Sequence, residues 1–293
     1  MGTKKRKSLK SLAAGRPPMA RSARSMSSKA SRTLINNHHQ LQKMRFQAAA
    51  NGDKDLEAAI STEIASLGGL NQYQQASLHG QSIERGGDTS KILLKWLSAD
   101  ELAGLGRRPS MLEVGSLSTR NACSTCGLFD VVHIDLNSQE PNILQQDFMA
   151  RPLPESEADK FDVISLSLVL NFVPDAMNRG QMLLRTLSFL RDSGKPSRDT
   201  AGGLPFPLLF LVLPRSCLDN SRYMTAGKLE ELMGTLGYEL VKAKSTQKLA
   251  YGLWGKARPL PSAAIEFTKR EINPGRTRNN FSITLKHPPT QST

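Results

Sequence analysis

In the middle of the chain, several short apolar runs each end at a polar residue or a glycine that could contact a ligand. These residues are Glu113, Gly115, Asp135, Asp147 and Asn171. Because the ligand crevice of an open α/β sheet lies at the carboxyl ends of its strands, these ends can converge on one ligand. The spacing from Gly115 to Asp135 is typical of a nucleotide-cradling turn followed by an acidic residue that holds ribose hydroxyls. We therefore predict a nucleoside-cofactor site.

Gly115 and Asp135 are the two anchors of this prediction. Gly115 lets the backbone approach a ligand where a side chain would collide, and Asp135 can accept two charge-assisted hydrogen bonds from a ribose diol. The G-x-G-x-x-G pattern of NAD-binding folds is missing, because Ser116-Leu117-Ser118 follows the glycine. The alternatives are an ordinary strand-to-loop glycine and a turn aspartate partnered by Asn137. Glu113, two residues before the glycine, favours the ligand role.

Two further pairs suit an adenine ring. Asp147 can accept from an adenine amino group while Phe148 covers the ring, although a helix-capping aspartate explains Asp147 equally well. Asn171 can pair with the Watson–Crick edge of a target adenine, and Phe172 can stack on an extruded base. A strand-end turn enforced by Pro174 is the alternative, and both interpretations stay open.

The three cysteines favour a reducing compartment over a disulfide scaffold. Cys123-x-x-Cys126 has no second pair to complete a four-ligand zinc site. It also lies away from the strand-to-helix junction typical of redox pairs. We therefore expect no metal.

Strands and helices alternate around these residues, which predicts a mostly parallel sheet. A closing antiparallel hairpin is expected near 239–243 and 249–254. Asp175 and Thr225 are placed to begin helices on the sheet. The other strands are expected at about 111–114, 130–135, 161–169 and 207–213.

The chain divides into four predicted parts. Residues 1–32 are a disordered basic tail, and 33–106 form a helical N-terminal extension that packs on or covers the sheet. Residues 107–256 hold the α/β domain. Residues 257–293 are a basic, largely irregular tail, in which a short apolar run near 263–267 is the one candidate for packing.

Charge is concentrated at the ends of the chain. Of the formal net charge of +13, residues 1–52 carry +12 and residues 256–293 carry +5, so the body carries −4. Such tails suit a polyanionic partner, because each neutralised phosphate releases counterions. Lys4-Lys5-Arg6-Lys7 is typical of a nuclear address, whereas the Arg- and Ser-rich, acid-free start also resembles a mitochondrial presequence. No apolar run reaches the length of about 20 residues that spans a membrane.

Several long strings in this sequence resemble the fungal 25S ribosomal RNA adenine-N1 methyltransferases. They are MLEVG, HIDLNSQ, QDFM, FDVISLSLVLNFVPD, GQML and LVLPRSCLDNSRY, preceded by GGLNQYQQASLHGQS and RGGDTSKILLKWL. The likeness covers about residues 60–255. It implies a Rossmann-like class I methyltransferase fold, in which the sheet domain binds S-adenosylmethionine.

The resemblance also implies the cofactor residues and the substrate. Gly115 and Asp135 would bind S-adenosylmethionine, and Glu113 and Asp147 would assist by class I analogy. The substrate would be 25S rRNA or a pre-ribosomal particle in the nucleolus of the nucleus, and a monomer is expected. The serines after Gly115 depart from the glycines usual in this class, which leaves the contacts to the methionine moiety undefined.

The implied reaction asks little of side chains. Adenine N1 carries a lone pair and no proton at neutral pH, so it can attack the methyl group without a general base. N1 is buried in a Watson–Crick pair, so the target adenine must be unpaired or flipped out, and Asn171 and Phe172 are the candidates to hold it. The alternative from another class is a non-catalytic S-adenosylmethionine sensor that acts through a protein partner.

Overall fold

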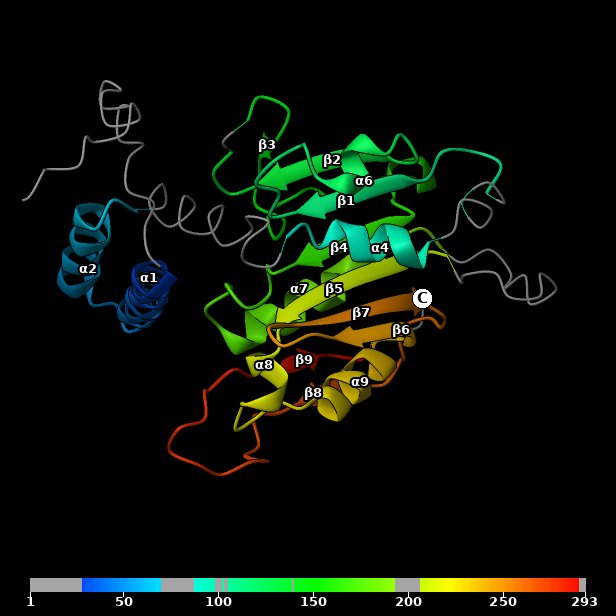
Figure 1. Ribbon diagram of the computed structural model, residues 1–293. Coiled ribbons are helices and arrows are strands. Elements are labelled where there is room, and N and C mark those ends of the chain that lie inside the picture. Colours follow the sequence, from blue (N-terminus) through cyan, green and yellow to red (C-terminus); the bar gives the residue numbers. More distant parts are fainter. Residues whose placement is uncertain are drawn as a thin grey trace, which may run out of the picture.

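The computed structural model describes six parts of the chain: residues 28–69, 87–97, 102, 105–138, 140–192 and 206–289 (Figure 1). Parts of the predicted helical extension, at residues 70–86, 98–101 and 103–104, lie outside them, as do residues 193–205 of the α/β domain. Within the described residues, no helix is both long and apolar enough to cross a membrane.

A seven-stranded sheet in the order β3-β2-β1-β4-β5-β7-β6 forms the centre of the protein. Neighbouring strands from β3 to β5 are parallel, and β7 is antiparallel to both β5 and β6. This confirms the predicted mostly parallel sheet with its closing hairpin. The strands are β1 (Ser110–Val114), β2 (Asp130–Asp135), β3 (Leu144–Gln145), β4 (Val163–Ser167), β5 (Leu208–Pro214), β6 (Tyr238–Ser245) and β7 (Leu249–Lys256).

The chain leaves β1 toward β2 and β3 on one side of the sheet, and continues to β4 and β5 on the other. The point where the strand order reverses therefore lies between β1 and β4. In open α/β sheets the ligand crevice forms there, outside the carboxyl ends of the strands. The topology thus puts the end of β1, with Gly115, at the crevice.

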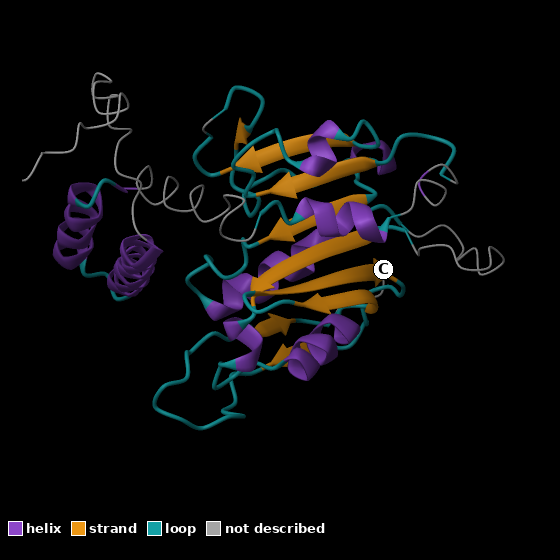
Figure 2. Cartoon of the chain, viewed as in Figure 1, coloured by secondary structure: helices purple, strands orange, loops and turns teal. Residues whose placement is uncertain are grey.

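Helices cover both faces of the sheet (Figure 2). α7 (Ala176–Phe189) and α9 (Ala226–Thr235) bury one face with Leu183 and Leu232, while α4 (Ser90–Trp96) buries the other face with Leu93. β4 and β5 lie between these layers, which explains their almost unbroken apolar sequence.

The predicted helix starts at Asp175 and Thr225 are confirmed. The Asp175 carboxylate accepts from the backbone N–H groups of Met177 and Asn178, and the Thr225 hydroxyl accepts from that of Lys228. Each cap satisfies backbone donors that the first turn of a helix leaves unpaired. The remaining short helices are α6 (Ala122–Thr125), α8 (Ser216–Asp219) and the 3-10 helix η2 (Glu157–Asp159).

The N-terminal extension differs from its prediction in two ways. α1 (Ser28–Ala50) begins before residue 33, so disorder is the wrong prediction for residues 28–32; residues 1–27 lie outside the described part. α1 and α2 (Lys54–Ser66) also bury a small cluster of their own, in which none of the described sheet residues takes part. Of the described residues of this extension, α4, Leu97 and Leu102 pack on the sheet. The cluster consists of Leu41, Ala48, Ile60 and Ile64.

The C-terminal segment is largely irregular, as predicted, but over its described residues it is packed on the domain, including the run near 263–267. β8 (Ile265–Phe267) pairs with β9 (Leu285–His287), and Phe281 and Ile283 are buried in the main core. The apolar residues alternate with polar ones near the end of the chain, and the Pro- and Arg-rich composition around them hides this strand-like pattern. Gly180 of α7 permits the contact, because a side chain there would overlap the Thr284 carbonyl.

Candidate cofactor and substrate site

The structure brings Gly115 and Asp135 together. Val114 and Ile134 are paired in the parallel register of β1 and β2, so the next residue of each strand lies at the same edge. The N–H groups of Gly115 and Ser116 both donate to the Ile134 carbonyl, at 2.8 and 3.1 Å. The two predicted anchors are therefore neighbours at the carboxyl edge of the sheet.

The packing of the protein requires a glycine at position 115, whether or not a ligand is bound. Its φ of +74° is strained for residues with a side chain, and a Cβ atom would lie 2.6 Å from Cγ2 of Val169. Val169 belongs to the turn after β4, which also carries Asn171. The close approach that the glycine allows is thus between the ends of β1 and β4, and contact with a ligand stays a prediction.

Asp135 forms the turn that was its alternative interpretation. Its Oδ1 atom accepts from the N–H of Asn137 at 2.8 Å. This bond fixes the carboxylate at the end of β2. It does not exclude the ligand role, because a carboxylate offers about four lone-pair positions on its two oxygens.

Glu113 connects the loop after β1 to β2. Its Oε2 atom lies 2.9 Å from His133 Nδ1 and accepts from Asn121 Nδ2 at 2.8 Å. Ser116 Oγ is also within 3.1 Å of His133 Nδ1. The side chain predicted to assist the cofactor is therefore part of the scaffold that shapes the loop of residues 116–121.

Two more carboxylates hold this loop, and neither was predicted from the sequence to do so. Glu140 accepts from the N–H and hydroxyl of Thr119, both at 2.9 Å, and from the hydroxyl of Ser118 at 3.0 Å. Asp88 accepts from the N–H of Ala122 at 2.6 Å. In the sequence, Gly86-Gly87-Asp88 marks the start of the helix that follows, and the bond from Asp88 to this loop was not predicted.

Glu140 makes the loop sensitive to acid. The hydrogen bonds from Thr119, with help from Ser118 and Arg120, lower the pKa of the Glu140 carboxyl from 4.5 to about 2. Because the pKa is depressed in the folded protein, the stabilisation is present above the unfolded value and is lost as the pH falls toward about 2.

Replacing Glu140 by glutamine should loosen the loop. A neutral amide keeps one acceptor oxygen, so the bonds to Ser118 or Thr119 are lost in part. Amide hydrogen exchange of residues 116–121 should become faster at neutral pH, with little change in the core strands. The exposed Glu230→Gln variant is the control. Equal exchange in wild type and the Glu140 variant would show that Glu140 does not hold the loop.

The two side chains of the predicted pair Asp147-Phe148 lie in different surroundings. Asp147 is exposed and its Oδ1 atom accepts from the N–H of Met149 at 2.8 Å, as in a capping turn. Phe148 is buried in the core, with its ring centroid 5.2 Å from that of Phe189. The prediction that Phe148 covers an adenine ring is therefore wrong. The cofactor role of Asp147 stays a prediction.

Asn171 and Phe172 lie in a tight turn after β4. Leu168 has a φ of +60°, which is unusual for a residue with a bulky side chain, and the Phe172 N–H donates to the Val169 carbonyl at 2.8 Å. Among the described residues, nothing hydrogen bonds to the buried Oδ1 atom of Asn171. A buried acceptor without a partner costs about 1–3 kcal/mol, and such strain and orphaned groups gather at functional sites.

Cys123 and Cys126 have structural contacts. Burial raises the pKa of the Cys123 thiol, which therefore stays protonated, and its Sγ atom lies 3.7 Å from the Ser90 carbonyl oxygen. Nowhere in the described ranges do three His, Cys, Asp or Glu side chains gather as metal ligands.

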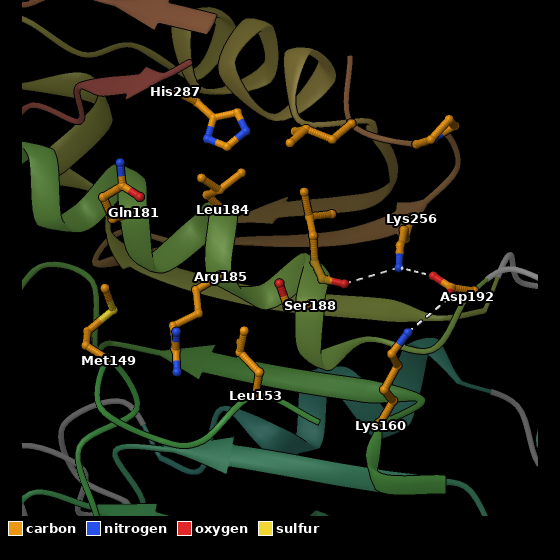
Figure 3. Close-up of a pocket in the computed structure, with 13 residues that line it drawn as sticks. Met149, Leu153, Lys160, Gln181, Leu184, Arg185, Ser188, Asp192, Lys256 and His287 are labelled. Atoms are coloured by element: carbon orange, nitrogen blue, oxygen red, sulfur yellow. Dashed lines mark hydrogen bonds and ion pairs between the residues drawn. The ribbon is translucent and has the colours of Figure 1, made fainter. Parts of the chain in front are cut away.

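A pocket of about 560 Å³ lies elsewhere, along α7 (Figure 3). At one end Asp192 lies between Lys256 and Lys160, at 2.9 and 3.0 Å. Lys160 precedes β4 and Lys256 ends the antiparallel β7, so this end of the pocket is at the amino edge of the parallel strands. It is distinct from the strand ends that carry Gly115 and Asp135.

The strand order, with an antiparallel β7 between β5 and β6, is that of the class I methyltransferase fold. The family model described as 25S rRNA (adenine(2142)-N(1))-methyltransferase, Bmt2, matches residues 58–283, and the chain belongs to this family. The resemblance found in the sequence is thereby confirmed.

Two relatives support the assignment. The 25S rRNA (adenine(2142)-N(1))-methyltransferase of Saccharomyces cerevisiae is 43% identical over 77% of this chain and 63% of its own length. The 25S rRNA adenine-N(1) methyltransferase of Schizosaccharomyces pombe is 38% identical over 85% of this chain and 89% of its own length. The chain thus spans less than two thirds of the first relative and most of the second.

Solved structures with a similar fold are more distant. An O-methyltransferase of neocarzinostatin biosynthesis, solved with S-adenosylmethionine, is 13% identical with a TM-score of 0.47, over 79% of this chain and 74% of its own. The 16S rRNA methylase RmtB is 12% identical with a TM-score of 0.41, over 76% of this chain and 98% of its own.

Proposed function

We propose that this protein transfers a methyl group from S-adenosylmethionine to N1 of an adenine in large-subunit ribosomal RNA. The observation that carries the proposal is membership of a family whose named relatives act on this substrate. The juxtaposition of Gly115 and Asp135 at the topological switch point supports it, because a nucleoside cofactor binds there in folds of this kind.

The residues at the strand ends fit the cofactor. Asp135 is held at the end of β2, where a carboxylate can accept from both hydroxyls of the ribose. The polar loop 116–121 is ordered by Glu113 and Glu140 beside it. When bound, S-adenosylmethionine supplies an electrophilic methyl group on a sulfonium.

The target adenine needs to be positioned more than activated. Its N1 atom has a lone pair, so the site need not remove a proton, and orientation supplies most of the rate. The unpaired Oδ1 atom of Asn171 suits the exocyclic amino group beside N1, and we propose that Phe172, in the same turn, stacks on the ring. The methylated base is cationic, and the nearby carboxylates of Glu113 and Asp135 favour that charge.

The direct test uses methyl-labelled cofactor and large-subunit rRNA from a strain that lacks the gene. Label should enter the RNA and appear as N1-methyladenosine at a single position. rRNA from the parent strain, which is already methylated, is the control. Cofactor binding without any label in RNA would instead support the alternative of a non-catalytic sensor.

Replacing Asn171 by alanine should lower methyl transfer about 10- to 100-fold, which corresponds to losing one buried hydrogen bond to the base. Affinity for S-adenosylmethionine should stay the same, because the residue acts on the base. The Asn178→Ala variant, on α7, is the control and should keep full activity. Unchanged rRNA methylation by the Asn171 variant would refute the role in base positioning.

The proposal extends to the place of action. Large-subunit rRNA is transcribed and assembled in the nucleolus, and the basic block Lys4-Lys5-Arg6-Lys7 suits a nuclear address. We infer that a monomer acts there on 25S rRNA or a pre-ribosomal particle. A fluorescent fusion distinguishes nucleolar from mitochondrial residence, and sedimentation of the tagged protein distinguishes free rRNA from particles.

A further inference from the structure

Six basic side chains gather beyond the carboxyl end of β5, and we call this group the basic rim. They come from two stretches, residues 215–222 around α8 and residues 268–280 in the loop that leads to the buried C-terminal segment (Figure 1). Hydrogen bonds from Arg222 and Asn279 join the two stretches. The basic rim consists of Arg215, Arg222, Lys269, Arg270, Arg276 and Arg278.

The charge of the basic rim is mostly not neutralised. Its two stretches, both fully described, contain two acidic residues, Asp219 and Glu271, and the one ion pair formed there joins Arg215 to Asp219. Arg222 and Arg278 donate to backbone carbonyls, at 2.9 Å to Gly275 and 3.3 Å to Asp219. Such bonds fix the arginines without cancelling their charge.

The amino edge of the sheet shows the opposite arrangement. There Arg107 is paired with Asp162, Arg108 with Asp130, and Arg258 with Glu239. Composition does not explain the difference, because both edges are rich in arginine. The protein leaves positive charge uncompensated beside the carboxyl ends of the strands, where the candidate site lies.

Arg179 fixes the basic rim next to the predicted base site. Its guanidinium donates to the Val173 carbonyl at 2.8 Å and to the Ser282 carbonyl at 2.6 Å, and it stacks 4.6 Å from the ring centroid of Phe281. Val173 follows Phe172 directly, and Ser282 lies two residues beyond the loop 268–280 that carries four residues of the basic rim. Arg179 therefore holds the turn that carries Asn171 next to the segment that follows the loop 268–280.

We propose that the basic rim binds the phosphodiester backbone of the RNA that flanks the target adenine. The inference rests on the proposed function and deepens it by naming the surface that receives the substrate. Uncompensated arginines on a fixed loop suit phosphate oxygens, because the guanidinium fork matches their geometry and each contact releases counterions. Contacts to the backbone fix the position of a strand, while the turn at Asn171 receives the base.

The test compares two double variants of the full chain that remove the same charge. Arg270→Gln with Arg276→Gln changes the basic rim at two exposed side chains, whereas Arg108→Gln with Arg258→Gln changes the amino edge. Binding of a fluorescein-labelled single-stranded RNA is measured by anisotropy over a range of salt concentrations. Each phosphate contact to a single strand contributes a salt slope of about 0.7, or about fivefold in affinity at 0.1 M salt.

The rim variant should therefore bind RNA about 25-fold more weakly at 0.1 M salt, with a salt slope smaller by about 1.4. The amino-edge variant should match wild type. Amide exchange of residues 268–280 in the wild-type protein should also slow when RNA is added. Both variants should bind S-adenosylmethionine normally.

If RNA affinity fell equally in both variants, the loss would come from the lower net charge of the protein, and the proposal would be overturned. Unchanged affinity in the rim variant, without protection of residues 268–280, would overturn it as well. Tighter binding of an acidic peptide than of RNA would assign the surface to a protein partner. If wild type binds RNA through the basic rim but transfers no methyl group, the proposed reaction fails and the surface stands.

Discussion

Replacing Asp135 by alanine is expected to weaken binding of S-adenosylmethionine about 100-fold. The carboxylate ends β2 beside Gly115, and we propose that it accepts from the ribose hydroxyls. A hydrogen bond to a charged group contributes about 1.5–3 kcal/mol, so losing two of them corresponds to a factor of this size or larger. Isothermal titration calorimetry measures the affinity directly.

Asp130 provides the matched control, since it is the first residue of the same strand and lies at the other edge of the sheet. Its exposed carboxylate forms a surface ion pair with Arg108, and its loss should leave cofactor affinity unchanged. Undiminished uptake by the Asp135→Ala protein would contradict the assignment of the site. An equal loss in both variants would point to a general effect on β2.

Replacing Asp162 by alanine is expected to destabilise the fold by about 2–3 kcal/mol, because the Ser110 N–H loses its acceptor while water can solvate Arg107, whose side chain is 45% exposed. The Asp162 side chain is 4% exposed and is bonded to Arg107 at 2.5 and 2.7 Å. It also accepts from the Ser110 N–H at 2.8 Å and lies 3.4 Å from Arg191. Asp162 therefore joins the starts of β1 and β4, whose other ends form the site. Urea unfolding measures the loss.

The exposed pair of Arg215 and Asp219 is the comparison, and Asp219→Ala should cost less than about 1 kcal/mol. Burial would raise the pKa of the Asp162 carboxyl, but the bonds from Arg107 and Ser110 outweigh it and lower the pKa below 3.8. The stabilisation is thus present above that value and lost as the pH falls further. The difference between wild type and Asp162→Ala should shrink in acid. A pH-independent difference would assign the effect to packing.

The parts of the fold that depend on residues close together in the sequence were predictable. The apolar runs of β4 and β5 and the caps at Asp175 and Thr225 are local patterns, and each appears in the structure at its predicted place. Strand β4 is shorter than its apolar run, because Leu168 turns the chain at a positive φ. At the end of the chain, the alternation of apolar and polar residues indicated packing better than the overall composition did, because the buried residues follow a polar loop.

Side-chain roles were less predictable than element positions. Phe148 follows a polar residue at the end of a strand, as Phe172 does, yet the first is buried against Phe189 while the second is partly exposed in the turn after β4. Glu140 carried no signal in the sequence, and Asp88 was marked only as part of a helix start. Their partners are 21 and 34 residues away, and such contacts depend on how the strands are ordered.

The sequence by itself determined the α/β class of this protein, its family and the positions of Gly115 directly after β1 and of Asp135 at the end of β2. Those features follow from local periodicity and from strings of residues that need no knowledge of distant contacts. Only the tertiary structure decided that Glu113 orders a loop and that Arg179 clamps the basic rim to the turn at Asn171. The physical reason is that a folded chain balances charge and hydrogen bonds between segments far apart in sequence.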